Sequence, residues 1–241
     1  MPARQKEEGL IPHLEALRVV LIKSLLALAA GFFALFFITP QIIDFLIKTV
    51  LGSAEIKLNF FAPMEVFLLQ IKTALALDIL LCWPYLAWQF WAFVLPALYD
   101  NERKFLSRGV FVCSGLFIAG SLFCLFFIAP LAVRFGLGFT TEQIQPVLGI
   151  SNILSLVLWL CLAFGAVFQL PFITFWLIKA GILDYNYVKA KRPYVIVALL
   201  IIAGLLTPPD IISQILLALP AYLLFEAGLF LAKAPEKNKT A

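Results

Sequence analysis

The stretch Ile153–Ile178, with the sequence ILSLVLWLCLAFGAVFQLPFITFWLI, decides the fold class of this chain. It contains no charged residue, and it is longer than the roughly 20 apolar residues that a helix needs to cross the hydrocarbon core of a bilayer. The stretch therefore predicts a transmembrane helix that is long enough to tilt in the membrane.

The composition of the whole chain also indicates a membrane protein. Of its 241 residues, 63% are hydrophobic and 13% are charged, and the mean hydropathy is +1.02. Soluble domains have about 45–50% apolar and about 25% charged residues. The net charge is +4, but the basic residues form no single stripe, so we expect no nucleic-acid partner. The four cysteines lie in apolar runs without Cys-x-x-Cys spacing, which predicts free thiols.

Further apolar runs on both sides of this stretch predict an all-α integral membrane protein with six transmembrane helices. The fifth run reaches only about 20 Å at 1.5 Å per residue, which is short of the roughly 30 Å core. The breaker Thr207-Pro208-Pro209-Asp210 follows it, so we expect the last two spans to be short and to form a hairpin. We expect residues 1–241 to form a single membrane domain. The expected spans are about 19–38, 66–87, 109–129, 153–178, 194–206 and 211–231.

The distribution of Lys and Arg predicts the orientation. Fourteen of these residues lie in the termini and in the loops on the same side, three lie on the other side, and Lys72 falls inside a span. Because cytoplasmic segments carry the excess of basic residues, both termini are expected in the cytoplasm. Residues Met1–Pro12 are polar and lack the apolar region and cleavage site of a signal peptide, so none is expected to be removed.

No enzyme motif stands out. The sequence has a single histidine, His13, and contains neither a His-Glu-x-x-His motif, nor a P-loop, nor a Gly-x-Ser-x-Gly elbow. We therefore expect no enzymatic activity, no metal and no cofactor. Polar residues at membrane depth remain, of which Asp78 suggests function or a buried pair. Gln169, beside Pro171, is equally explained by a bond between helices worth around 1 kcal/mol.

A series of short motifs runs in order from residue 13 to about 231, and together they resemble those of TatC, the receptor subunit of the twin-arginine protein translocase. Any one alone would be weak, but their order and coverage are specific. The motifs are His13-Leu14-Glu15-Ala16-Leu17-Arg18, Pro63-Met64-Glu65 with Lys72, Pro84-Tyr85 through Gln89-Phe90-Trp91-Ala92-Phe93, Pro96-Ala97-Leu98-Tyr99, Glu102-Arg103-Lys104, Ala163-Phe164-Gly165, Lys191-Arg192-Pro193-Tyr194, Thr207-Pro208-Pro209-Asp210 with Gln214, and Leu224-Phe225-Glu226.

This resemblance implies a receptor and core subunit in the bacterial cytoplasmic (inner) membrane. Such a protein binds twin-arginine signal peptides at the cytoplasmic face, assembles with TatA- and TatB-type single-span subunits and with itself, and exports folded proteins with the proton gradient as driving force. The resemblance makes Glu102 the main carboxylate for the signal peptide, with Glu15, Arg18, Arg103 and Lys104 around it. Arginine engages carboxylates by bidentate hydrogen bonds that lysine cannot copy.

The sequence departs from the family pattern at two of these places. The position of the family's second glutamate is Ala16, and Glu15 stands one place earlier, about 100° away on a helix. Glu15 replaces that glutamate if the segment is not helical; otherwise the contact is lost or moved. Gln169 stands where many relatives carry a glutamate, in a polar cluster that meets TatA or TatB helices, and a neutral amide still serves there.

The resemblance also assigns a docking edge for the single-span partners to the final hairpin. Its polar residues are Thr207, Gln214 and Glu226, and its outer loop contains Pro208, Pro209 and Asp210.

Two other functions stay open at this point. An ion-coupled secondary transporter would use Lys72, Asp78 and Glu226 as a relay, although the sequence shows no repeat of the kind such transporters have. Alternatively, Lys72 only extends toward the headgroups and Glu226 only pairs with a basic side chain. The second open function is that of a structural anchor without a ligand, which would tolerate any residue in place of Glu102.

Overall fold

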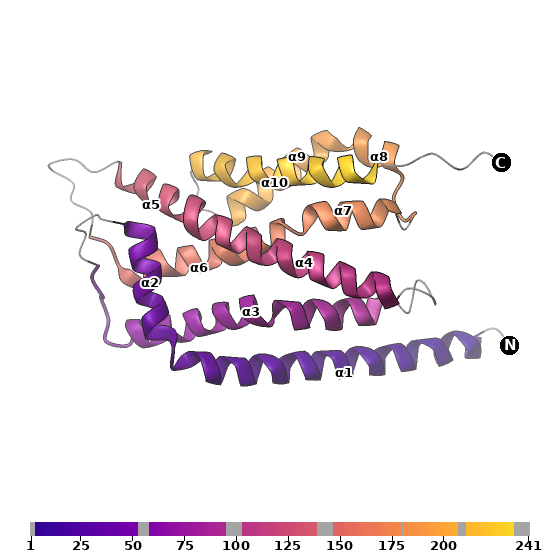
Figure 1. The fold of residues 1–241 in the computed structure, drawn as a ribbon, viewed down its shortest axis with the longest axis horizontal. Helices are drawn as coiled ribbons and strands as arrows, with labels where there is room; N and C mark the ends of the chain where they lie inside the picture. Colours follow the sequence, from indigo (N-terminus) through magenta and orange to yellow (C-terminus); the bar gives the residue numbers. More distant parts are fainter. Residues whose placement is uncertain are drawn as a thin grey trace.

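The computed structural model describes residues 3–52, 58–94, 103–138, 147–179, 181–206 and 211–233 (Figure 1). The secondary structure of these residues is helical, apart from one isolated bridge between Asn59 and Gly149. The fold is thus all-α, as the sequence predicts. The helices in chain order are α1 (Ala3–Phe36), α2 (Thr39–Leu51), α3 (Glu65–Val94), α4 (Arg103–Phe123), the π-helix η2 (Cys124–Ile128), α5 (Ala129–Leu137), α6 (Ile150–Val167), α7 (Leu170–Lys179), α8 (Tyr185–Ala190), α9 (Arg192–Leu206) and α10 (Ile211–Ala232).

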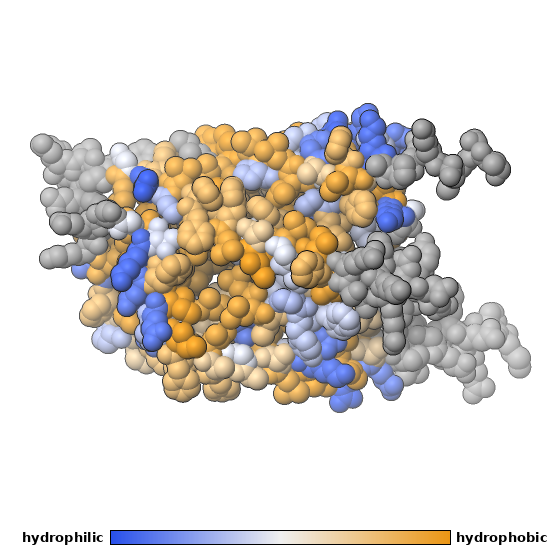
Figure 2. All heavy atoms as spheres, viewed as in Figure 1, coloured by the Kyte–Doolittle hydropathy of each residue, from blue (hydrophilic) through white to orange (hydrophobic). Residues whose placement is uncertain are grey.

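Within the described residues, five helical segments are long and apolar enough to cross a membrane. They are Leu14–Phe36, Glu65–Phe93, Gly109–Leu137, Ile150–Lys179 and Gln214–Ala232. The apolar helix Arg192–Gly204 is shorter, as expected of the fifth run. The expectation that both final segments are short is wrong for α10, because its 22 residues extend about 33 Å at 1.5 Å per residue. Figure 2 shows a broad apolar belt with polar residues toward both ends.

The bundle is built from pairs of helices that pack against each other. Helix α1 packs against α3, which also contacts α4 and α6, while α10 packs against α7 and α9 (Figure 1). Helix α2 crosses one end of the bundle steeply. The start of α1 and the end of α10 both lie at the opposite end. The largest buried cluster forms around Phe164, where α6, η2, α9 and α10 meet.

Small residues allow α4 and α6 to approach closely. A methyl group on Gly165 of α6 would lie 2.7 Å from Oγ of Ser121 and 2.8 Å from the ring of Phe117. The Ser121 hydroxyl donates to the carbonyl of Cys161 over 3.0 Å, which links the two helices. Glycine at a crossing and a hydroxyl bonded across it are typical of helix packing in membranes, where burial of apolar surface gives little driving force.

The prolines have three different effects on the helices. Pro84 lies inside α3, which continues past it through residues 88–93 to Val94. Pro130 follows the π-helix η2, and the helix continues through α5 to Leu137, past the expected end of that span at residue 129. Of these three prolines, only Pro171 coincides with a break, which lies between α6 and α7. A π-turn takes up the backbone distortion that a proline imposes, whereas the break leaves two shorter helices.

Candidate functional site

The predicted peptide-binding residues are placed only in part by the structure. Glu15 and Arg18 lie on α1, with exposed side chains. Arg103 and Lys104 are the first two residues of α4, and Glu102 lies outside the described residues. The start of α1 and the start of α4 lie at the same end of the bundle (Figure 1). Three basic residues and one carboxylate therefore belong to the two helices whose starts lie at this end.

The backbone decides between the two alternatives for Glu15. Residues 13–18 lie inside α1, so the segment is helical throughout. On a helix, Glu15 projects about 100° away from the direction of Ala16. The side chain of Glu15 therefore points in a different direction from that of Ala16.

Gln169 lies at the break between α6 and α7. Pro171 has no N–H to donate to the carbonyl of Val167 one turn earlier, so the regular ladder of hydrogen bonds is interrupted there. The Gln169 side chain is 7% exposed, and its Nε2 donates to the carbonyl oxygen of Cys113 in α4 over 2.9 Å. This bond joins α4 to the break, as one of the two interpretations of Gln169 predicts.

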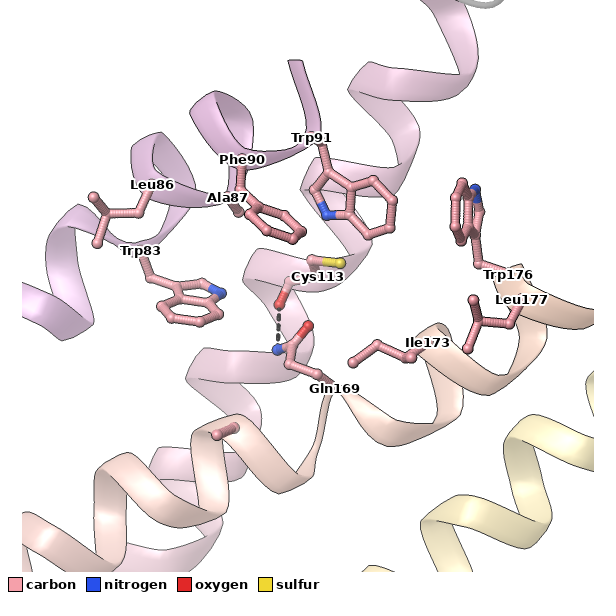
Figure 3. A pocket seen from close by; sticks show the side chains of 11 residues that line it. Trp83, Leu86, Ala87, Phe90, Trp91, Cys113, Gln169, Ile173, Trp176 and Leu177 are labelled. Atoms are coloured by element: carbon pink, nitrogen blue, oxygen red, sulfur yellow. Dashed lines mark hydrogen bonds between the residues drawn. The ribbon is translucent and has the colours of Figure 1, made fainter. Parts of the chain in front are cut away.

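The same amide borders a hollow of about 610 Å³ between α3 and α7, with α4 behind it (Figure 3). Its walls are almost entirely apolar, and three tryptophans contribute to them. The lining residues are Trp83, Leu86, Ala87, Phe90, Trp91, Cys113, Ala166, Gln169, Ile173, Trp176 and Leu177.

The tryptophans of the hollow are held by ring contacts. The ring of Trp83 stacks on Phe117 at 3.8 Å between centroids, and the ring of Trp91 meets that of Trp176 edge to face at 5.0 Å. The indole Nε1 of Trp83 is buried and has no hydrogen-bond partner in the described part of the chain. The hollow thus offers an apolar guest almost entirely apolar walls, with the Gln169 amide at its border.

Sequence reasoning missed the hollow, although a signal exists. Trp83, Ala87, Phe90 and Trp91 follow the spacing i, i+4, i+7 and i+8, which places them on one face of a helix. The opposite wall of the hollow depends on the break at Pro171. The spacing of residues on α3 cannot reveal that break.

Glu226 is bonded inside the protein. Its Oε2 accepts from Nη2 of Arg192 over 2.7 Å, and its Oε1 accepts from the hydroxyl of Tyr222 over 2.9 Å. The pair joins the start of α9 to α10 at half-buried positions. A carboxylate engaged at both oxygens is a structural clamp, which agrees with the interpretation of Glu226 as a partner for a basic side chain.

Gln214 plays a similar part at the other end of this hairpin. Its Nε2 donates to the carbonyl of Leu200 over 2.8 Å, which joins α10 to α9. Thr207 and the three expected loop residues Pro208, Pro209 and Asp210 lie outside the described residues.

Lys72 and Asp78 have separate surroundings. Lys72 Nζ donates to Oγ of Ser155 over 3.4 Å. Asp78 is fully buried where α3 faces α1, and a methyl group on Gly31 would collide with its carboxyl group. One Asp78 oxygen accepts from the Cys82 thiol over 3.2 Å, and the other has no partner in the described residues. The structure thus gives Lys72, Asp78 and Glu226 three different sets of partners. No group of three or more possible metal ligands occurs among the residues described.

The long apolar helices, the apolar belt and the polar side chains bonded between helices define the chain as a helical membrane protein that crosses the bilayer several times. The chain belongs to the TatC family: the model of the Sec-independent protein translocase protein (TatC) matches residues 12–220. It is thus a component of a translocase and acts in protein transport.

Curated relatives and solved structures agree with this family. The chain is 36% identical to the TatC protein of Carboxydothermus hydrogenoformans over 95% of this chain and 94% of the relative. It is 35% identical to the TatC protein of Aquifex aeolicus, over 95% of this chain and 97% of the relative. The fold matches a crystal structure of the twin-arginine translocase receptor TatC with a TM-score of 0.85 at 35% identity, over 92% of this chain and 99% of that one.

Proposed function

We propose that this chain is the receptor and core subunit of a twin-arginine translocase. It binds twin-arginine signal peptides at the cytoplasmic face of a bacterial inner membrane and gathers the other subunits that export folded proteins. The observation that carries this proposal is the match to a solved structure described as the twin-arginine translocase receptor, over 92% of the chain at a TM-score of 0.85. In this role the protein is a binding scaffold without catalysis.

The proposed topology is a single membrane domain of six spans with both termini in the cytoplasm. It is supported by the basic residues, fourteen on the side of the termini and three on the other. It is also supported by the start of α1 and the end of α10, which lie at the same end of the bundle, as an even number of crossings requires (Figure 1). In this topology α9 is the short span.

The proposed peptide site lies at that end of the bundle. Glu102 is its main carboxylate, Glu15 a second one on another face of α1, and Arg18, Arg103 and Lys104 set the local charge. A guanidinium group forms two parallel hydrogen bonds with one carboxylate, which a lysine ammonium cannot do. The site should therefore prefer a peptide with two arginines over the same peptide with two lysines.

Peptide binding to the purified protein tests this site. Loss of one charge-assisted contact in Glu102→Ala should weaken binding of the twin-arginine peptide by about 1.5–3 kcal/mol, or roughly 10- to 150-fold. The matched control is Asp44→Asn, which removes an exposed carboxylate from α2 at the other end of the bundle. Equal binding of both peptides to the wild type would refute the receptor site, and equal losses in both variants would indicate an unspecific charge effect.

We also propose that single-span subunits of the TatA and TatB type dock on two surfaces. One is the hollow beside Gln169, whose walls are almost entirely apolar, with the amide at its border. The other is the α9–α10 edge with Thr207, Gln214 and Glu226 and the loop Pro208-Pro209-Asp210. Gln214 and Glu226 would stabilise this edge, because both are bonded between its helices. Copies of this chain would associate with one another around the same partners.

Disulfide crosslinking to a partner with cysteines along its single span distinguishes these surfaces. Ala166→Cys puts a thiol at an exposed position of the hollow, and Ala29→Cys puts one on the exposed face of α1 as the control. We expect crosslinks at residue 166 and few at residue 29. Equal crosslinking at both positions would mean that the partner has no preferred surface, which would contradict docking at the hollow.

The ion-coupled transporter stays the alternative function. It requires Lys72, Asp78 and Glu226 to exchange an ion, whereas each has a different partner in this structure. A proton flux into vesicles that depends on Asp78 would favour it over the receptor.

A further inference from the structure

A second hollow of about 520 Å³ lies between α3 and α6, away from the one beside Gln169. Its floor is made by Ala76 and Leu158, which are 5% and 7% exposed. Its rims are Leu75 and Trp159, which are 46% and 54% exposed. The small side chain of Ala76 leaves the groove open between the two rims. In a membrane protein, exposed apolar walls on membrane-spanning helices face the lipid, so the hydrocarbon chain of a lipid fits the groove.

One end of the groove is polar. Lys72 lies about 10 Å along α3 from its first residue, and helical side chains lean toward the N-terminus, so Nζ reaches back toward the membrane surface. Its ammonium donates to Ser155 Oγ over 3.4 Å, and an ammonium carries three donors. No carboxylate pairs with Lys72 among the described residues. A cation and a hydroxyl group therefore meet at one end of the apolar groove, on the side where α3 begins.

We propose that this groove is a binding site for an anionic phospholipid, with the phosphate on Lys72 and Ser155 and one acyl chain between Leu75 and Trp159. The groove combines a polar end with apolar walls, which match the headgroup and the acyl chain of a lipid. This combination favours a lipid over the single span of a partner protein. A partner helix would need both a carboxylate for Lys72 and an apolar face that fits between Leu75 and Trp159. A phospholipid carries its phosphate at the membrane surface, toward which Nζ reaches, and basic pockets between transmembrane helices bind such headgroups.

The rim tryptophan makes the proposal measurable. The protein is reconstituted in vesicles of zwitterionic lipid with a small fraction of brominated phosphatidylglycerol or, in parallel, brominated phosphatidylcholine. Bromine quenches a tryptophan that it touches, and Trp159→Phe identifies the share of the signal that comes from the groove, since the chain has five tryptophans. We expect phosphatidylglycerol to quench Trp159 at a roughly fivefold lower fraction, the factor expected for one basic side chain at an anionic surface.

Three variants assign the preference to Lys72. Lys72→Gln should abolish it, and Lys72→Arg should keep it. Lys48→Gln should also keep it, because Lys48 is an exposed lysine on α2 outside the groove.

The proposal is overturned if both lipids quench Trp159 equally in the wild type, or if Lys72→Gln keeps the preference. It is equally overturned if Lys48→Gln loses as much, because the effect would then be general surface charge. A single-span partner that protects Trp159 from both lipids would make that partner the occupant and refute the lipid. None of these results depends on peptide binding, so the receptor proposal stands or falls separately.

Discussion

The Arg192–Glu226 pair gives the sharpest test of how the final hairpin is held. The side chains are 36% and 28% exposed, so the pair lies between a surface ion pair, worth about 0–1 kcal/mol, and a fully buried one, whose disruption costs about 3–5 kcal/mol. Glu226→Gln keeps an oxygen for the Tyr222 hydroxyl and removes only the charge. We expect this variant to lose about 1.5 kcal/mol of unfolding free energy, roughly a tenfold change in the unfolding equilibrium.

A double-mutant cycle separates the pair from its surroundings. Glu226→Gln, Arg192→Met and the double variant are unfolded in mixed micelles by raising the fraction of denaturing detergent, with tryptophan fluorescence as the signal. We expect the double variant to lose about 1 kcal/mol less than the sum of the single losses, because the two side chains form one interaction. Additivity within about 0.3 kcal/mol would refute the clamp. A proton flux into vesicles that Glu226→Gln abolishes would instead favour the transporter alternative.

Three further predictions follow from individual contacts. Gly165→Ala should lower the unfolding free energy by about 1–3 kcal/mol in the same assay, because its methyl group would overlap Ser121 and Phe117, whereas Gly115→Ala, with open space around it, should cost much less. Asp78→Asn should keep or raise the stability and leave proton flux unchanged, since it removes a buried carboxylate that no cation pairs with in the described residues; a loss above about 2 kcal/mol would contradict this. Gln169→Leu should cost only about 0.6–1 kcal/mol of stability, the value of one hydrogen bond between helices, but should weaken partner crosslinking at the hollow; unchanged crosslinking would remove Gln169 from docking.

The features that the sequence predicts well are those set by one segment at a time. Long apolar runs predict membrane helices because the bilayer fixes the length that a helix needs, and α1, α3 and α6 follow from that rule. The short fifth run is likewise present as α9.

The rest depends on contacts between segments. Pro84, Pro130 and Pro171 are the same residue in similarly apolar runs, yet only Pro171 coincides with a break. What happens at a proline depends on whether a π-turn or a neighbouring side chain satisfies the backbone groups it frees. The close packing of Asp78 against Gly31 is also invisible in sequence, because the two residues lie on different helices. The hollow beside Gln169 needs walls from four helices, α3, α4, α6 and α7.

The hydrogen bonds of the polar side chains at membrane depth distinguish residues that stabilise the fold from residues that can bind a ligand. Gln214 and Glu226 form hydrogen bonds to neighbouring helices, so substitution of either residue should mainly lower the stability. Gln169 and Lys72 also bond within the protein, but each borders an apolar hollow that a ligand can enter. Substitutions at these two should therefore change binding more than stability. A polar group is retained in the bilayer only where a partner satisfies it. For Gln169 and Lys72, we expect a bound ligand outside the chain to provide some of the hydrogen-bonding partners.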